Sequence, residues 1–401
     1  MNNLGHLYST QYNHTRNLED LQIAINYAEI AEKATPEGHP NRARWLLNLG
    51  NYFYRRYNRT DEPQDMELAT AAWLAAWSIP TAPVLIRIRV ALMAIENIVS
   101  DPSAGQDPRA YSLVHVASHL ISLATSRSLQ REDQQYILEQ LNGLASLAAA
   151  VPLQAGQSPL EALRLQELGR SITNGQLLDY RSDISDLMEQ HPTLAKDFDT
   201  LREELDSSLS PSTEYSTDAS IGKQLQDQQA AICRWNKVAI DLNDILQQIR
   251  QKPGFQTFLL AESEEYFLSA AREGPIIVLN ASKLRSDAIL LTKEQVTSIP
   301  LHKLSHTLVV KHFSTSSNDN GDKREILHWL WKAAVQPVLQ ELGFYPKAVD
   351  PLPRIWWLGV GLLAQAPIHA AVKFTKGTVK LNMSTLQYCL PSYTSTIRAL
   401  Q

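Results

Sequence analysis

The sequence has little sulfur chemistry and none of the common catalytic signatures. It holds two cysteines, Cys233 and Cys389, in 401 residues, too few for a disulfide framework and typical of a reducing compartment. It has no G-x-x-x-x-G-K-[ST] loop, no G-x-S-x-G turn, no H-E-x-x-H helix and no C-x-x-C pair. These absences argue against P-loop nucleotidases, serine hydrolases of the α/β class and common zinc sites.

Targeting and membrane signals are also missing. Met1 is followed by Asn, Asn, Leu and Gly rather than by a basic and then an apolar run, so we expect no export signal and a cytoplasmic protein. Ile355–Val372 is uncharged for 18 residues but contains Gln365, Pro367 and His369. It is barely long enough to cross a bilayer, and we expect a buried segment of a soluble protein instead. The chain has 37 basic and 42 acidic residues, so it lacks the basic excess that is typical of nucleic-acid-binding proteins, and we expect no nucleic-acid partner.

An internal repeat opens the chain. Shifted by 45 positions, the N-terminus aligns with itself: Asn3-Leu4-Gly5 with Asn48-Leu49-Gly50, Tyr12-Asn13 with Tyr57-Asn58, Thr15 with Thr60, Asp20 with Asp65, and Ala24 with Ala69. Each copy is expected to form a helix, a polar turn and a second, alanine-rich helix with one apolar face. A single helix pair cannot bury that face, so such pairs stack. Residues 1–80 resemble tetratricopeptide (TPR) repeats of an expanded kind.

Residues 81–206 are expected to continue as a helical extension without an obvious repeat. A helix is expected to begin with Ser158 as its N-cap, Pro159 at its first position and Glu161 at its third. The carboxylates that gather between Asp183 and Asp206 alternate with apolar residues, so we interpret them as a solvated helical face rather than an acid/base or cation site. Residues 207–220 are polar, lack periodicity and are expected to be a linker.

Residues 221–401 have a mixed pattern. We expect helices over 221–250, 301–313 and 323–342, and strands over 276–280, 288–291, 295–299 and 354–358. This is the pattern of an α/β region with a partly buried sheet. The fold class expected for the whole chain is therefore multidomain, with all-α repeats followed by an α/β part.

Four stretches carry a resemblance to a known family, and they occur in order along nearly the whole chain. They are GRSITNGQLLDYRSDISDLMEQHP, KPGFQTFLLAESEEYFLSAAREGPIIVLNASKLRSDAILL, RIWWLGVGLLAQAPIHAA and PSYTSTIRAL. They resemble landmarks of fungal proteins that join TPR repeats to a C-terminal CHAT domain, a caspase-like, separase-related module. The resemblance implies that residues 221–401 form the N-terminal part of a CHAT domain with a caspase-like fold.

The resemblance also implies a cysteine nucleophile activated by histidine, in His-Gly and Ser-Ala-Cys contexts that follow the segment matching Ser392-Tyr393-Thr394. Neither context occurs before Gln401. We therefore expect a CHAT portion truncated ahead of its dyad, with no catalytic residue in this chain. His369 and Cys389 could form a dyad in space, but we expect His369 to be a buried or partly satisfied side chain. Cys233 is expected to pack as a small apolar side chain.

Other motifs suggest sites only weakly. Gly359 to Ala364 match the G-x-G-x-x-A dinucleotide fingerprint, but Pro367 interrupts the required helix and no acidic residue follows Pro351. Two histidine pairs have helical spacing but lack further ligands: His115 with His119, and His302 with His306. Lys373, Lys376 and Lys380 are best explained as the protection of an exposed hairpin edge. We expect no cofactor and no metal.

Two hypotheses for function follow. The first is a non-catalytic interaction or scaffold protein, whose TPR-like helices bind a protein or peptide while the CHAT portion is inactive. The alternative is a caspase-like cysteine peptidase whose catalytic part is missing from this chain.

Overall fold

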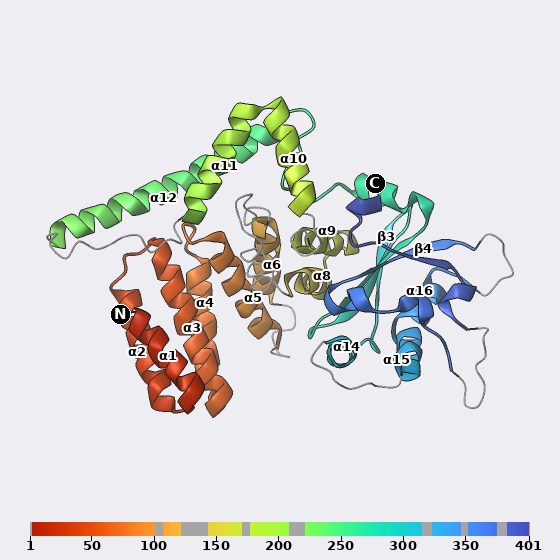
Figure 1. The fold of residues 1–401 in the computed structure, drawn as a ribbon, viewed down its shortest axis with the longest axis horizontal. Coiled ribbons are helices and arrows are strands. Elements are labelled where there is room, and N and C mark those ends of the chain that lie inside the picture. Colours follow the sequence, from red (N-terminus) through yellow and green to blue (C-terminus); the bar gives the residue numbers. More distant parts are fainter. Residues whose placement is uncertain are drawn as a thin grey trace. The chain divides into compact units, whose positions relative to one another are not determined.

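The structure is a computed structural model. It describes residues 2–100, 107–121, 143–170, 177–207, 221–314, 323–345, 352–374 and 383–400. Most described residues are helical, and one small mixed sheet lies in the C-terminal part of the chain (Figure 1). No helix among them is long and apolar enough to cross a membrane.

The chain divides into two compact units that do not follow chain order. A helical unit draws its described residues from Met1–Ile98, Leu120–Leu141 and Leu177–Leu259. A sheet unit draws on Val99–His119, Asn142–Gln176 and Leu260–Gln401. Part of the expected helical extension thus belongs with the sheet. The expected linker falls almost wholly outside the described residues, because Ser207 ends a helix and residues 208–220 are not described.

The helical unit begins with two antiparallel helix pairs. They are α1 (Asn2–Thr15) with α2 (Leu18–Lys33), and α3 (Pro40–Thr60) with α4 (Pro63–Trp77). Alanines and large apolar residues fill the space between the helices; Leu21, Ala24, Ala28, Ala69 and Trp73 are almost completely buried. Burial of this shared apolar face, rather than intrinsic helix propensity, stabilises such pairs.

The sequence repeat has a structural counterpart at equivalent positions. Both first helices end at the equivalent threonines, and the next residues, Arg16 and Asp61, share the left-handed conformation with φ of 56° and 58°. The equivalent Asp20 and Asp65 are both buried and both hydrogen-bonded by side chains of the preceding helix. The offset of 45 residues therefore describes a repeated local structure.

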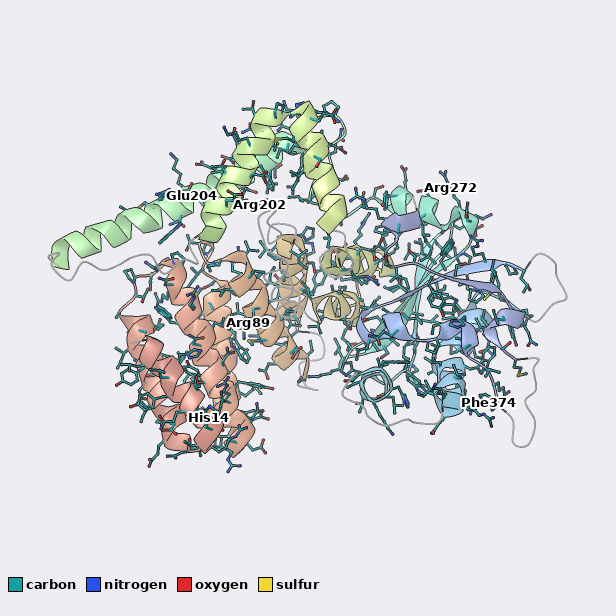
Figure 2. The ribbon with its side chains drawn as sticks, in the orientation of Figure 1. His14, Arg89, Arg202, Glu204, Arg272 and Phe374 are labelled. Atoms are coloured by element: carbon teal, nitrogen blue, oxygen red, sulfur yellow. The ribbon has the colours of Figure 1, made fainter. Side chains whose placement is uncertain are left out.

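The rest of the described helical unit consists of four further helices. They are α5 (Val84–Ser100, in this unit up to Ile98), α10 (Leu177–Gln190), α11 (Pro192–Ser207) and α12 (Ile221–Arg250). In this acidic stretch, Phe198 is buried against Phe258 while Glu204 pairs with Arg234 at 2.5 Å. Side chains of this region, Arg202 and Glu204 among them, are drawn in Figure 2. The carboxylates do lie on helices as expected, and two of the apolar residues between them, Leu187 and Phe198, are buried.

The sheet unit is built on five strands in the order β3-β2-β1-β4-β5. β1 (Ile276–Ala281) pairs antiparallel with β2 (Ser286–Leu291), and β2 pairs antiparallel with β3 (Val296–Pro300). β4 (Arg354–Gly359) pairs parallel with both β1 and β5 (Leu390–Tyr393). The carboxyl ends of β1, β4 and β5 therefore share one edge of the sheet.

Helices cover both faces of this sheet, which explains why the first four residues of β1 are apolar. Ile276 and Val278 face the helices α8 (Leu144–Gln154), α9 (Pro159–Arg170) and α13 (Glu264–Ala270). Ile277 and Leu279 face the opposite layer, formed by α14 (His306–Phe313), α15 (Lys323–Leu330) and α16 (Gln336–Glu341). The two layers lie on opposite sides of the sheet (Figure 1). The helix α6 (Pro108–Leu120) also belongs to this unit.

Two expected helices begin or continue differently. The helix expected over 301–313 begins only at His306, after a turn in which Leu304 N–H donates to Leu301 O at 2.8 Å. The helix expected over 323–342 contains a wider π turn, Trp331–Val335, between α15 and α16. The expected strands are all present within two residues of their expected ends.

Candidate functional site

Cys389 is not placed to act as a nucleophile. It is completely buried within the core on one face of the sheet. Its thiol donates to the backbone carbonyl of Thr385 at 3.7 Å. Burial raises the pKa of Cys389 to about 12, so the thiolate that a cysteine enzyme needs is not populated near neutral pH.

His369 has a different partner. It lies in the short 3₁₀ segment Ile368–Ala370, and its backbone N–H donates to the hydroxyl of Tyr393 at 2.8 Å. That hydroxyl also lies 2.8 Å from Nδ1 of His369. Because the oxygen accepts the backbone proton, it can give its own proton to Nδ1, which leaves the imidazole proton on Nε2. His369 is exposed, and its ring is hydrogen-bonded, so the second of the two expected alternatives is the one observed.

Tyr393 is therefore the residue that fixes the histidine, and sequence reasoning missed it. Burial raises the pKa of Tyr393, and the backbone N–H groups of His369 and Ile368 oppose that shift. Tyr393 is the last residue of β5 and the tyrosine of the PSYT stretch. Among the described residues, His369 and Cys389 thus bond to separate partners and form no hydrogen-bonded dyad.

Cys233 lies on α12 and is exposed. This corrects the expectation that it packs as a small apolar side chain. Exposure alone does not activate a thiol, because activation needs a neighbouring base, cation or helix N-terminus.

The two thiols should differ sharply in alkylation. With iodoacetamide at neutral pH, we expect Cys233 to be labelled in the native protein and Cys389 to be labelled only after denaturation, because Cys389 is buried and its pKa is raised. Mass spectrometry of the tryptic peptides before and after guanidinium treatment measures this. The variant Cys233→Ser is the control that should abolish native labelling, and rapid native modification of Cys389 would contradict the assignment.

The histidine pairs do not assemble metal sites. The rings of His115 and His119 lie 4.7 Å apart on α6, but His119 Nδ1 is 2.8 Å from the backbone carbonyl of His115. Burial and the neighbouring His119 lower the pKa of His115, and Glu161 opposes this at 3.8 Å. In the described part of the chain, no three His, Cys, Asp or Glu residues gather as metal ligands. The other pair does not share one helical face, since His302 lies in the turn before α14 and His306 begins that helix.

The remaining sequence motifs also have structural roles or fall partly outside the described residues. β4 is followed by a 3₁₀ helix, Gly361–Gln365, rather than by the α-helix of a dinucleotide fold. Lys373 N–H donates to Met383 O at 2.9 Å, next to the antiparallel bridge between Val372 and Ser384. Lys376 and Lys380 lie outside the described residues.

The carboxyl edge of β1, β4 and β5 encloses a cavity of about 240 Å³. Arg170, the last residue of α9, lines it and is 3% exposed. Its guanidinium donates to the carbonyls of Gly359 at 3.3 Å and Ser395 at 2.5 Å. Arg170 therefore links α9 to the chain at the ends of β4 and β5. The helical periodicity of the sequence does not predict this role.

A second cavity lies on the helical unit, at the ends of α1 and α3. We call it the arginine groove; it measures about 460 Å³ and is lined by Tyr12, Asn13, Arg16, Arg55, Asn58 and Arg59. Figure 2 labels His14, which follows Asn13 on α1. The groove forms here because α1 and α3 are equivalent helices of successive repeats and end at equivalent threonines.

Charge distinguishes the arginine groove from the nearby helix surface. Arg56 is neutralised by Asp65, with donated hydrogen bonds of 2.8 and 2.5 Å. Arg55 Nη1 instead donates to Ser9 Oγ at 2.7 Å and Asn13 Oδ1 at 3.3 Å, both neutral groups. Within the described ranges, no carboxylate forms an ion pair with any arginine of the groove. The arginine groove therefore presents three arginines that have no ion-pair partner within the described ranges.

No protein-family model matches the chain, and no curated protein matches it.

Proposed function

We propose that the chain is a protein-interaction scaffold of the TPR and CHAT type, inside the cell, in which the helical repeats bind a segment of another protein. The single observation that carries this proposal is the arginine groove, where two successive repeats present three arginines without a carboxylate partner among the described residues. Stacked helix pairs commonly use such surfaces to bind extended segments. In this proposal the sheet unit is a caspase-like remnant that contributes no nucleophile, in keeping with the buried, high-pKa Cys389.

The peptidase alternative is less well supported by the residues of this chain. A cysteine peptidase needs a thiolate within hydrogen-bond reach of a base. Cys389 bonds to a backbone carbonyl, and His369 bonds to Tyr393. The peptidase alternative stays a prediction. In the scaffold proposal, neither Cys233 nor Cys389 acts as a nucleophile.

A steric block tests the scaffold function without changing charge. Peptides selected against the full chain from a displayed random library are expected to bind in fluorescence anisotropy, and Asn58→Trp should weaken them at least about tenfold by filling the arginine groove. Asn58 is exposed at the groove wall. The matched control is Asn26→Trp, which places the same ring on an exposed position of α2 and should change affinity less than about twofold.

Two results would contradict the proposal. One is that no peptide enriches against the full chain; the other is that the enriched peptides bind equally to Asn58→Trp. Cysteine-dependent hydrolysis of general peptide substrates by the purified chain would favour the peptidase instead.

A further inference from the structure

Two of the three guanidiniums of the arginine groove, those of Arg55 and Arg16, are held in place by neutral partners. Arg55 is fixed by Ser9 Oγ and Asn13 Oδ1. Arg16 lies above the ring of Tyr12, at 5.9 Å from its centroid, and Tyr12 is 4% exposed. A cation held over an aromatic face or by neutral acceptors keeps its full charge while losing side-chain freedom. Less ordering entropy is then lost when an anion binds.

The two buried acidic residues near this end of the helices, Asp20 and Asp65, already have hydrogen-bond partners. Asp20 accepts hydrogen bonds from Gln11 Nε2 at 2.9 Å and Thr15 Oγ1 at 2.6 Å. Asp65 accepts two bonds from Arg56. Both aspartates are buried at equivalent positions of the two repeats. Their charge is used to join each helix pair, so it does not neutralise the arginine groove.

We propose that the arginine groove binds a phosphorylated serine or threonine side chain in the partner segment. The inference rests on the proposed scaffold function and deepens it. A phosphate monoester carries close to two negative charges and three acceptor oxygens, and it accepts paired hydrogen bonds from guanidinium groups. A carboxylate carries one charge and two oxygens, which leaves part of a three-arginine site unsatisfied. Asn13 adds a donor, because its carbonyl oxygen already accepts from Arg55 and its amide protons are left for a ligand.

The test uses the full chain and a fluorescein-labelled peptide library with a fixed central phosphothreonine and degenerate flanks. Anisotropy is measured beside the same library with threonine, and beside one with glutamate at that position. We expect the phosphorylated library to bind at least about tenfold more tightly than either relative. Rising salt should weaken that binding, because exposed charges are screened.

Variants locate the binding in the arginine groove. Arg59→Gln removes one exposed charge and should weaken phosphopeptide binding about tenfold; Arg16→Asn also removes a charge but suits the left-handed backbone at φ 56° and should do the same. Lys33→Gln is the matched control, since Lys33 is an exposed cation of α2 outside the groove, and should have no effect. Circular dichroism melts verify that each variant is folded.

The outcomes separate this inference from the scaffold function. Equal affinity for the phosphothreonine and glutamate libraries, tighter binding of a single-stranded RNA probe, or unchanged affinity in both arginine variants would overturn the phosphate assignment. If display-selected peptides still lose binding in Asn58→Trp, the scaffold proposal survives that result. If no peptide of any kind binds, both proposals fail.

Discussion

Gly50→Ala should destabilise the helical unit by about 2 kcal/mol, although alanine is the better helix former by about 1 kcal/mol. A Cβ atom at Gly50 would lie 2.4 Å from Nε1 and 2.6 Å from Cδ1 of Trp73. Trp73 is 2% exposed, so its ring has no open space into which it can move. The methyl group therefore forces α3 and α4 apart, and the loss of packing outweighs the gain in helix propensity.

Gly5→Ala is the matched control at the equivalent position of the first repeat. There a Cβ atom would lie 3.3 Å from the Ala24 carbonyl oxygen, a tight contact that a small shift relieves. We expect a change of less than about 1 kcal/mol in either direction. Hydrogen–deuterium exchange of peptides from α1 and α3 measures both effects locally, which matters because a chain of two units need not unfold in one step.

A partial rescue ties the effect to the tryptophan ring. Trp73→Phe removes the atoms nearest to the new methyl group, so the double variant with Gly50→Ala should be more stable than the sum of the two single losses. Simple additivity, or equal losses for Gly5→Ala and Gly50→Ala, would show that the ring is not the cause.

The repeat and the strands are the parts of the fold that the sequence predicts well. The offset of 45 residues identifies the equivalent helix ends because the same turn residues recur at Thr15 and Thr60. β1 is recognisable because a strand buried on both faces needs an uninterrupted apolar run. In both cases the local sequence contains the physical cause of the element.

Departures from the expected helices have causes that simple periodicity does not report. Pro337 has no N–H to give to the carbonyl four residues earlier, and Gln336 N–H instead reaches Trp331 O, which produces the π turn. The late start of α14 depends on the turn after β3, where Leu301 N–H donates to Ser286 O of β2 at 2.8 Å. Pro337 can be read from the sequence, whereas the hydrogen bond from Leu301 to Ser286 depends on the pairing of β3 with β2.

The candidate site was harder to predict because its charges do not follow the repeat. Asn13 and Asn58 align between the two copies, but Arg16, Arg55 and Arg59 align with an aspartate, a threonine and a histidine. A search for repeated residues therefore passes over the arginines that give the groove its charge. The pairing of His369 with Tyr393 likewise depends on β5 lying parallel to β4, which brings residues from separate segments together.

Arg170→Met should destabilise the sheet unit by about 3 kcal/mol near neutral pH. The substitution keeps much of the side-chain volume but removes the donated bonds to the Gly359 and Ser395 carbonyls. It also removes the cation that stabilises Glu167, whose Oε2 accepts from Ile397 N–H at 3.1 Å. Arg164→Met on the same helix is the control; Arg164 gives one bond to the Glu262 carbonyl at 3.1 Å and should cost about 1 kcal/mol.

The loss in Arg170→Met should also depend on pH, with a sign that follows from Glu167. Burial raises the pKa of Glu167, while the Arg170 cation and the Ile397 N–H oppose the shift. A carboxyl whose pKa is raised in the folded state contributes stability that is fully present below its unfolded pKa and is lost as pH rises through its folded pKa. Without Arg170 the pKa rises further, so Arg170→Met should lose more stability at about pH 8 than at about pH 5. The measurement is urea unfolding, monitored by hydrogen–deuterium exchange of β5. Adding Glu167→Gln to Arg170→Met should flatten the pH dependence, because no carboxylate then remains at this position to be charged without its cation. An equal loss of stability at both pH values in Arg170→Met would show that Glu167 takes no part.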